Sequence, residues 1–342
     1  MTRYLAVFQL LVLAGVMAVS IPLALGFFGR WHPAVDSIAH FRAHLAIMLI
    51  IAAPVLFLTA MRPQALFALV FGLSALSTTT TGSILPGLGP VQAAFAPRDD
   101  NQATYRLLQM NLRFDNPDPG KVLSLIGRTQ PDVMTFDEVS AMWAERLQSL
   151  FAAYPYHVLC PYPNGVFGVA ILSRRPFAEG SEPHCADRGA FAVAKVDFGG
   201  READIAAIHL GWPWPFGQLQ QIGRLTPALT SLGETALLAG DLNATPWSNA
   251  VANVAAVAGA TRVPLNGATW QHHSLPDMLR FAGLPIDHVF TRGGVLVHSI
   301  SRLEPAGSDH LPVLVEFSFV DEKPAQPATT ATVSLARISP QG

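Results

Sequence analysis

Three long apolar segments dominate the N-terminal part of the chain. Residues 4–29, 43–61 and 63–97 contain no Asp, Glu, Lys or Arg. About 20 apolar residues of helix cross a bilayer core, and a helix that is apolar on all sides lies in a large core or in a membrane. The pattern therefore predicts a transmembrane region over residues 1–96. Its three helices are expected near residues 4–28, 45–61 and 65–84.

The first apolar segment could alternatively be a secretory signal peptide, because Arg3 precedes it. The segment is longer than a typical signal-peptide core, and two further apolar segments follow it. We therefore favour an uncleaved bundle of helices.

Positive charges flank the three segments almost symmetrically. Arg3 and Arg62 fall on one side of a three-span arrangement, and Arg30 and Arg42 fall on the other, so the positive-inside rule is nearly balanced. The short N terminus and the short turn at residues 61–64 suit the cytoplasmic side. We therefore expect a multi-pass protein of a bacterial inner membrane, with its C-terminal domain outside the cytoplasm.

The rest of the chain follows a different pattern. A polar linker at residues 97–104 ends the uncharged stretch, and short β-type runs then alternate with helical ones up to residue 320. The tail at residues 321–342 is rich in Pro, Ala and Thr and is expected to be disordered. Strands are expected at residues 105–111, 132–136, 168–173, 191–198, 203–210, 235–241, 286–291 and 312–318. Helices are expected at residues 119–129, 140–151, 216–232 and 248–259.

Several of these strands are apolar on both faces, as in a sheet that is buried between layers. Helices can cover the outer faces of such sheets. The pattern therefore predicts an α/β domain over residues 105–320, built as a sandwich of two sheets flanked by helices.

Charge and cysteine content narrow the function of this domain. From Arg98 onward the chain carries 23 Asp and Glu against 18 Lys and Arg, whereas a protein that binds duplex DNA usually presents a basic face. Its longest basic cluster is the pair Arg174 and Arg175. Cys160 and Cys185 could form a disulfide outside the cytoplasm or remain two unpaired thiols.

Polar residues occur at the ends of the predicted strands. One Asp after a strand is common in turns, and one His in an apolar strand is usually a core residue. If the strand ends converge, however, Glu138, Asp241 and Asp309 bring three carboxylates together, which is costly without a cation. Oxygen ligands without a Cys cluster suit Mg²⁺ or Mn²⁺. The polar residues are Asn111, Asp137, Glu138, His209, Asp241, Asn243, Asp287, His288, Asp309 and His310.

The order of short motifs carries a resemblance to a known family. The chain reads "QMN", "FDEV", "GVAILSRRP", "IHL", "GDLNATP", "IDHVF" and "SDHLPV". This order resembles the endonuclease/exonuclease/phosphatase superfamily of DNase I-like proteins, over residues 105–318. The resemblance implies a four-layer αββα sandwich and a Mg²⁺- or Mn²⁺-dependent phosphoric ester hydrolase.

The resemblance also implies roles for individual residues. Glu138 corresponds to the metal-binding Glu of the family, helped by Asn111 or Asp309. Asp241 and Asn243 match the pair that faces the scissile phosphate. His310, oriented by Asp287, is the expected catalytic histidine that either takes the water proton or donates to a phosphoryl oxygen, and Asp241 is the alternative base. His209 is expected to bind the phosphate. One departure is Asp137, which stands where the family often has Gln and could tighten the metal or point into solvent.

The substrate follows less directly from the sequence. The predicted spans favour a phosphate ester at a membrane, such as a phospholipid or a polyprenyl phosphate. Trp212, Trp214 and Phe216 could form a lip over the site at the lipid interface or pack on the sandwich edge. Two alternatives remain: a membrane-tethered nuclease acting on nucleic acid outside the cytoplasm, and a catalytically inactive scaffold.

Overall fold

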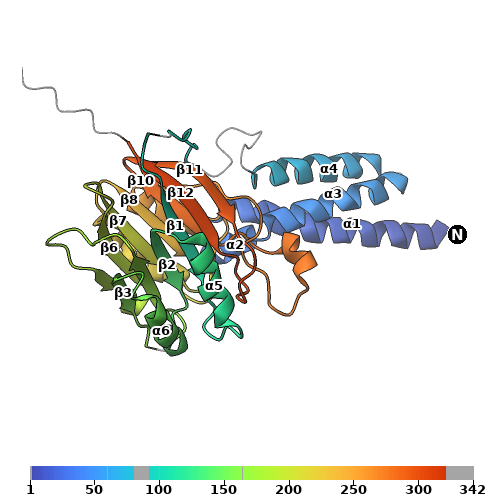
Figure 1. Ribbon diagram of the computed structural model, residues 1–342. Helices are drawn as coiled ribbons and strands as arrows, with labels where there is room; N and C mark the ends of the chain where they lie inside the picture. Colours follow the sequence, from blue (N-terminus) through green and yellow to red (C-terminus); the bar gives the residue numbers. More distant parts are fainter. Residues whose placement is uncertain (1, 60, 81–91, 100, 164, 321–342) are drawn as a thin grey trace, which may run out of the picture.

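The computed structural model describes residues 2–59, 61–80, 92–99, 101–163 and 165–320. A bundle of N-terminal helices projects from one side of a larger α/β domain (Figure 1). The tail that was predicted to be disordered lies outside the described residues. The N-terminal helices are α1 (Thr2–Leu25), the short η1 (Gly26–Phe28), α2 (Pro33–Ala39), α3 (Arg42–Leu58) and α4 (Arg62–Ser77).

Each of the three apolar segments contains a helix, but the helices differ in length. Ala6–Phe28 is the one stretch of the described chain that is long and apolar enough to cross a membrane by itself, and α2 with α3, bent by 55°, could form a second span. Helix α4 has 16 residues, fewer than the about 20 that a span requires. By length and composition the structure thus supports one or two of the three predicted spans.

The helices pack side by side and present apolar side chains outward. Small residues of α3 and α4 make the contact, and a Cβ on Gly72 would lie 2.9 Å from the Ala46 carbonyl oxygen. Large apolar side chains point away from the bundle; Leu11 and Ile51 are two-thirds exposed. An apolar surface of this extent marks a membrane or a partner rather than water.

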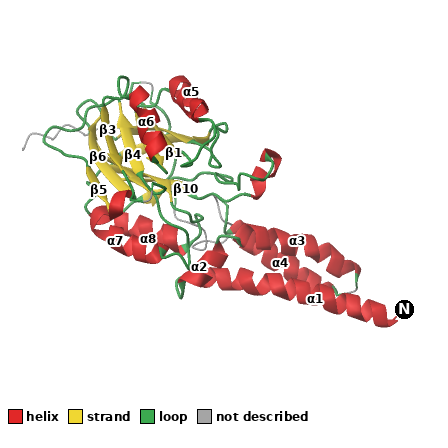
Figure 2. Ribbon diagram, turned by 90° about the horizontal axis from the view of Figure 1, so that it is seen from below, coloured by secondary structure: helices red, strands yellow, loops and turns green. Residues whose placement is uncertain are grey.

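The C-terminal domain is a sandwich of two mixed sheets with helices on both outer faces, as predicted (Figure 2). In the described part of the chain each sheet has six strands. The first sheet has the order β11-β12-β1-β2-β4-β3 and the second β5-β6-β7-β8-β10-β9. The strands of the two sheets are β1 (Tyr105–Asn111), β2 (Val133–Asp137), β3 (Tyr156–Cys160), β4 (Val169–Ser173), β5 (His184–Ala186), β6 (Phe191–Asp197), β7 (Glu202–Ile208), β8 (Ala236–Asp241), β9 (Thr261–Arg262), β10 (Asp287–Arg292), β11 (Val295–Arg302) and β12 (Val313–Phe319).

Helices cover each outer face because their apolar stripes match the sheets. The α5 and α6 helices cover the first sheet and α7 and α8 the second. Helix α8 begins at a capping residue, Ser248, whose Oγ accepts a hydrogen bond from the Val251 amide, and ends at Gly259 with a φ of 58°. The bounds are α5 (Pro119–Thr129), α6 (Ala141–Leu147), α7 (Gln218–Thr230) and α8 (Asn249–Ala258), with short helices η2 (Gln148–Leu150), η3 (Asp187–Gly189) and η4 (Asp277–Ala282).

The sequence pattern missed four strands, and all four are sheet edges. β3 and β11 border the first sheet, and β5 and β9 border the second. An edge strand buries one face at most, so β11 places Ile300 between Ser299 and Ser301, and β9 is only two residues long. The apolar runs that define central strands are absent there.

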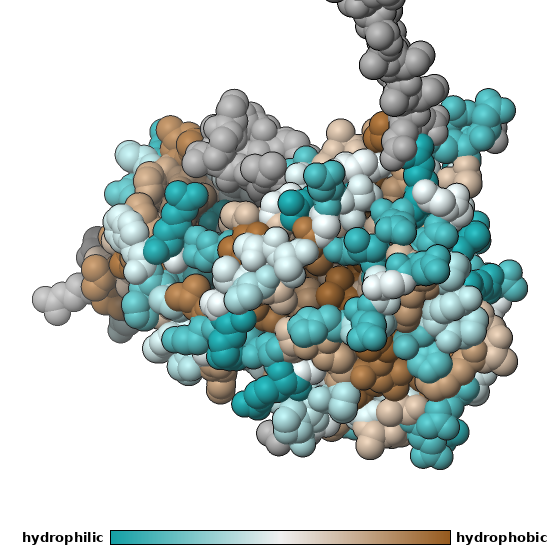
Figure 3. All heavy atoms as spheres, turned by 90° about the vertical axis from the view of Figure 1, so that its left-hand side faces the viewer, coloured by the Kyte–Doolittle hydropathy of each residue, from teal (hydrophilic) through white to brown (hydrophobic). Residues whose placement is uncertain are grey.

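Between the sheets lies the largest apolar core, in which Phe198, Phe317 and Phe319 contact Tyr105. On the face turned away from the helices, polar and apolar residues are interspersed (Figure 3). The two cysteines, Cys160 at the end of β3 and Cys185 in β5, form a disulfide that joins the edges of the two sheets.

Candidate functional site

Strand pairing explains why residues far apart in sequence meet at one end of the sandwich. Strands β1 and β2 run parallel, so Asn111 lies opposite Asp137 where both strands end. Strand β10 runs antiparallel to β8, which pairs its first residue, Asp287, with the last residue of β8, Asp241. Antiparallel pairing of β1 with β12 brings His310, just before β12, to the same end.

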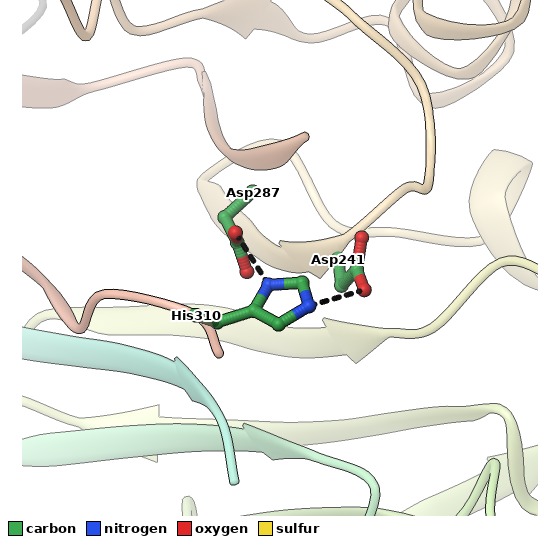
Figure 4. Close-up of side chains that lie close together, drawn as sticks. All are labelled: Asp241, Asp287 and His310. Atoms are coloured by element: carbon green, nitrogen blue, oxygen red, sulfur yellow. Dashed lines mark hydrogen bonds and ion pairs between the residues drawn. The ribbon is translucent and has the colours of Figure 1, made fainter. Parts of the chain in front are cut away.

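His310 lies between two carboxylates at the centre of this end (Figure 4). Its Nδ1 is 2.8 Å from Asp287 Oδ2, and its Nε2 is 3.6 Å from Asp241 Oδ2. The backbone amide of His310 donates to Ser308 Oγ, which in turn donates to the Asn111 carbonyl oxygen. The imidazole is therefore fixed by both its ring and its main chain, with all its partners buried.

The carboxylate of Asp241 accepts hydrogen bonds from two other residues of the site. Its Oδ1 accepts from the Asn243 amide at 2.7 Å, and its Oδ2 accepts from Asn111 Nδ2 at 3.0 Å. Asn243 takes the left-handed backbone conformation, with a φ of 48°, and its own Nδ2 donates to the Leu210 carbonyl oxygen. The tight turn after β8 thus aims a main-chain amide at the carboxylate.

Glu138 lies beside Asp241, on the loop after β2. It has a φ of 55°, a strained conformation that a non-glycine residue keeps only where its surroundings require it. Its Oε1 accepts from Asn111 Nδ2, and its Oε2 accepts from the Phe114 amide at 2.8 Å. Asn111 therefore presents its amide nitrogen to both Glu138 and Asp241, and its oxygen accepts from the Arg113 amide.

Asp309 and His209 complete the set of predicted residues. Asp309 Oδ2 accepts from the Trp270 indole at 3.2 Å. His209 is fully buried beside Asp241, with its Nε2 3.7 Å from Asp241 Oδ2 and its ring against Phe167. All eight predicted residues thus lie at one end of the sandwich.

Asp137 neither points into solvent nor reaches outward to a metal, the two roles that the sequence had suggested. It is buried between the sheets, where its Oδ2 accepts from the Asp241 amide at 2.7 Å and from Gln109 Nε2 at 3.1 Å. Burial, and next the charge of Asp241, raises the pKa of Asp137 well above its usual range. Alternation along β2 turns its side chain inward while Glu138 faces the site.

Sequence reasoning missed three supporting residues. Gln109 bridges Asp137 and Asp287 through one amide nitrogen; Ser308 holds His310, and Trp270 holds Asp309. Gln109 and Ser308 lie inside the quoted motifs, each two residues from a predicted site residue. Alternation along β1 places Gln109 on the same face as Asn111, and this pattern could have identified it. Trp270 lies in a segment without a motif, and only the fold reveals it.

The charges of the site are strongly interdependent. Burial alone would lower the pKa of His310, but the carboxylates of Asp287 and Asp241 outweigh it and raise that pKa to about 10. Burial raises the pKa of Asp241 to about 7, against the opposing effect of His310. The pKa of His209 falls to about 3, chiefly through burial, so its imidazole is neutral.

The donor set fits a hard divalent cation. Glu138, Asp241 and Asp309 supply carboxylate oxygens, and no cysteine lies among the described residues of the site. Burial raises the pKa of Glu138, and a cation beside such a buried carboxylate would favour its ionised form. Asp241, Asp287 and His310 also offer atoms within 4.8 Å of one another, but His310 is already held by Asp287, which favours the Glu138 side.

Comparison with known proteins agrees with this geometry. The sequence profile described as the Endonuclease/Exonuclease/phosphatase family matches residues 108–310, and the chain belongs to that family. Its members are hydrolases that cleave phosphoester bonds, so the resemblance predicted from the motifs is confirmed. A search of curated proteins finds no match.

Solved structures show the same fold at low sequence identity. An endonuclease/exonuclease/phosphatase from Bacteroides vulgatus is 18% identical with a TM-score of 0.54, and the match covers 64% of this chain and 100% of that one. TDP2 from D. rerio, complexed with a single-stranded DNA product, is 19% identical with a TM-score of 0.52, covering 63% of this chain and 99% of that one.

Proposed function

We propose that the protein is a membrane-anchored, Mg²⁺- or Mn²⁺-dependent phosphoesterase that hydrolyses a phosphate ester of a membrane lipid. The observation that carries this proposal is a pair of aromatic contacts made by one loop, one toward the helical bundle and one toward the candidate site. His32, before α2, contacts Trp214 edge-on, and Trp212 contacts Trp270 in the same way. Trp270 donates to Asp309 in the site.

The bundle and the site lie on the same side of the sandwich. Figure 1 shows the N-terminal helices and the short orange helix η4 on the same side of the sandwich. His44 Nε2 in α3 is 2.8 Å from the Ala282 carbonyl oxygen, at the end of η4. This arrangement supports a site that faces the membrane surface.

The rim between bundle and site is rich in exposed apolar side chains. Trp residues favour the membrane–water interface, and those of the rim are at least half exposed. A lipid whose head group reaches the site would bury these side chains, whereas a nucleic acid would make no favourable contact with the aliphatic ones. The rim comprises Trp31, Trp212, Trp214, Phe216, Leu275, Met278 and Phe281.

The chain is proposed to cross a bacterial inner membrane three times, with α4 as a short third span and the catalytic domain outside the cytoplasm. The end of α1, the start of α3 and the end of α4 all adjoin the domain, and the N terminus lies at the far end (Figure 1). The disulfide between Cys160 and Cys185 supports an oxidising compartment.

The site residues divide the chemistry between them. His310, protonated and held by Asp287, donates Nε2–H to a phosphoryl oxygen and stabilises the charge that develops there. Asp241 is the general base that accepts a proton from the attacking water, with the Asn243 amide orienting its carboxylate. His209, as a neutral imidazole, hydrogen-bonds a non-bridging oxygen.

Glu138 and Asp309 would hold the divalent ion, and Asn111 orients Glu138. The ion would supply Lewis-acid stabilisation of the phosphoryl charge. Asn111 is assigned this orienting role because its amide nitrogen, not its oxygen, faces the two carboxylates.

A nuclease finds less support in the structure. The basic pair Arg174 and Arg175 lies at the end of β4 away from the site, since Ser173 pairs with the first residue of β2. Arg174 stacks on Tyr154, and Arg175 pairs with Asp132. The largest basic cluster therefore serves packing rather than a nucleic-acid surface.

The test uses the full chain in liposomes with Mg²⁺ and three substrates: a lipid pyrophosphate, bis-p-nitrophenyl phosphate and plasmid DNA. We expect chelator-sensitive hydrolysis that favours the lipid. Trp214→Ala is expected to lower lipid hydrolysis and spare the soluble diester, whereas Tyr156→Ala, an exposed aromatic on β3, changes neither. Preference for DNA would establish the nuclease, and absence of all hydrolysis would leave a scaffold.

A further inference from the structure

One apolar cavity of the described chain lies apart from the candidate site. It has a volume of about 420 Å³ and lies between helix α3 and the catalytic domain. Ile47 and Met48 line it from the helix, and Leu265 and Leu284 line it from the domain. Its size falls within the range of small-molecule sites, and none of the eight predicted catalytic and metal residues lines it.

One buried cation, Arg262 on β9, lines this cavity. Its side chain is 3% exposed, its Nε has no hydrogen-bond partner, and one terminal nitrogen donates to the Val263 carbonyl oxygen at 3.1 Å. No carboxylate of the described residues pairs with it. Burial lowers the pKa of Arg262 to about 10, so the guanidinium is charged at neutral pH.

Among the described residues no carboxylate compensates the charge of Arg262, whose pKa is shifted by burial. The nearby titratable groups are histidines: buried His288 on β10 is affected electrostatically by both Arg262 and His40. His44 faces the cavity from α3, with its Nδ1 buried and unpartnered. A buried charge is retained only when it is paired, and here the pairing group must come from outside the described chain.

The geometry points to a second lipid site: we propose that this cavity binds one anionic phospholipid, with its phosphate on Arg262 and its acyl chains along Ile47 and Met48. Both of these α3 side chains are also about half exposed. They therefore form a continuous apolar path from the cavity to the outer surface of the helices. A lipid, unlike a free anion, matches both the cation and the apolar walls. This inference rests on the membrane anchoring in the proposed function, but not on catalysis.

The experiment is native mass spectrometry of the full-length His310→Ala chain in detergent, titrated with phosphatidylglycerol or phosphatidylcholine. The inactive background prevents turnover, so a failure of the proposed hydrolysis leaves the result readable. We expect one phosphatidylglycerol per chain, bound at least about tenfold more tightly than phosphatidylcholine. Arg262→Gln should abolish the preference, while Arg128→Gln, an exposed arginine on α5, should retain it.

A second variant protects against misfolding of the Arg262 substitution. Ala43→Phe fills the cavity from α3 and keeps the charge, and it should also prevent retention of the lipid. Equal binding of the two lipids, or an unchanged preference in both cavity variants, would overturn the proposal. Competition by inorganic phosphate as effective as that by the lipid would show a soluble anion site instead.

Discussion

Replacing Asp287 by Asn removes the carboxylate that holds His310. The two groups are 2.8 Å apart and fully buried, and among the described residues no other carboxylate is within hydrogen-bonding distance of His310 Nδ1. A positioned acid contributes about 10²- to 10⁴-fold to a rate, which corresponds to ~3–5 kcal/mol of activation free energy. We therefore expect kcat for bis-p-nitrophenyl phosphate to fall by about 10²- to 10⁴-fold, with little change in KM.

The pH profile separates this effect from a structural one. With Asp287 present, the pKa of His310 is raised to about 10; without it, burial lowers that pKa, and the basic limb of kcat should move to lower pH. Asp204→Asn is the matched control, because Asp204 is a buried acid on β7 that accepts from the Gly233 amide away from the site. An Asp287→Asn variant with kcat within about twofold of wild type would refute the assigned role of His310.

Further predictions concern stability, metal and anchoring. His288 is neutral because burial lowers its pKa to about 3; the unfolded state takes up the proton first, so stability should fall from pH 6.5 toward 3 by about 1.4 kcal/mol per pH unit. His288→Gln should flatten that slope in urea titrations, and an unchanged slope would contradict the assignment. Glu138→Gln should weaken Mg²⁺ binding at least about tenfold by calorimetry, and equal affinity would exclude it as a ligand. Asp36→Ala should lower the free energy of unfolding by ~1–3 kcal/mol, because its carboxylate accepts from two amides at the start of α8; an unshifted denaturation midpoint would count against this link. Reduction of Cys160–Cys185, 25 residues apart, should cost about 3 kcal/mol, read as a lower urea midpoint, whereas a reductant-insensitive midpoint would mean that the bond contributes nothing.

The sequence was sufficient for the central strands and for the residues that follow them. Central strands such as β4 are apolar on both faces, and this signal is local. The motif order then placed Glu138, Asp241 and His310 at strand ends, and parallel pairing brings such ends together. Edge strands carry no comparable signal, because one side of each faces water.

Other features depend on contacts that no local pattern records. Asp137 looked like a second exposed acid beside Glu138, but its partner is the backbone amide of Asp241 on the other sheet. Asn111, predicted to help Glu138 hold a metal, directs its amide nitrogen to two carboxylates, and its oxygen accepts from the Arg113 amide. Both outcomes follow from which way a strand faces and from the packing of two sheets.

The sequence also did not predict how the N-terminal helices pack on the C-terminal domain. The carboxylate of Asp36 and the carbonyl oxygen of Ala39 are engaged by α8 and Trp247, more than 200 residues later. A single acid among apolar segments predicts burial or pairing, but not with which partner.

The candidate site is divided between the two sheets. Glu138 and His310 come from the first sheet, and Asp241 and Asp287 from the second. The apolar side chains between the sheets therefore act as a spacer that sets the gap across which the acid and the base of the reaction must cooperate. Shortening a core side chain such as Phe317 would change that gap. Turnover would then change at a smaller loss of core thickness than the loss needed to unfold the domain.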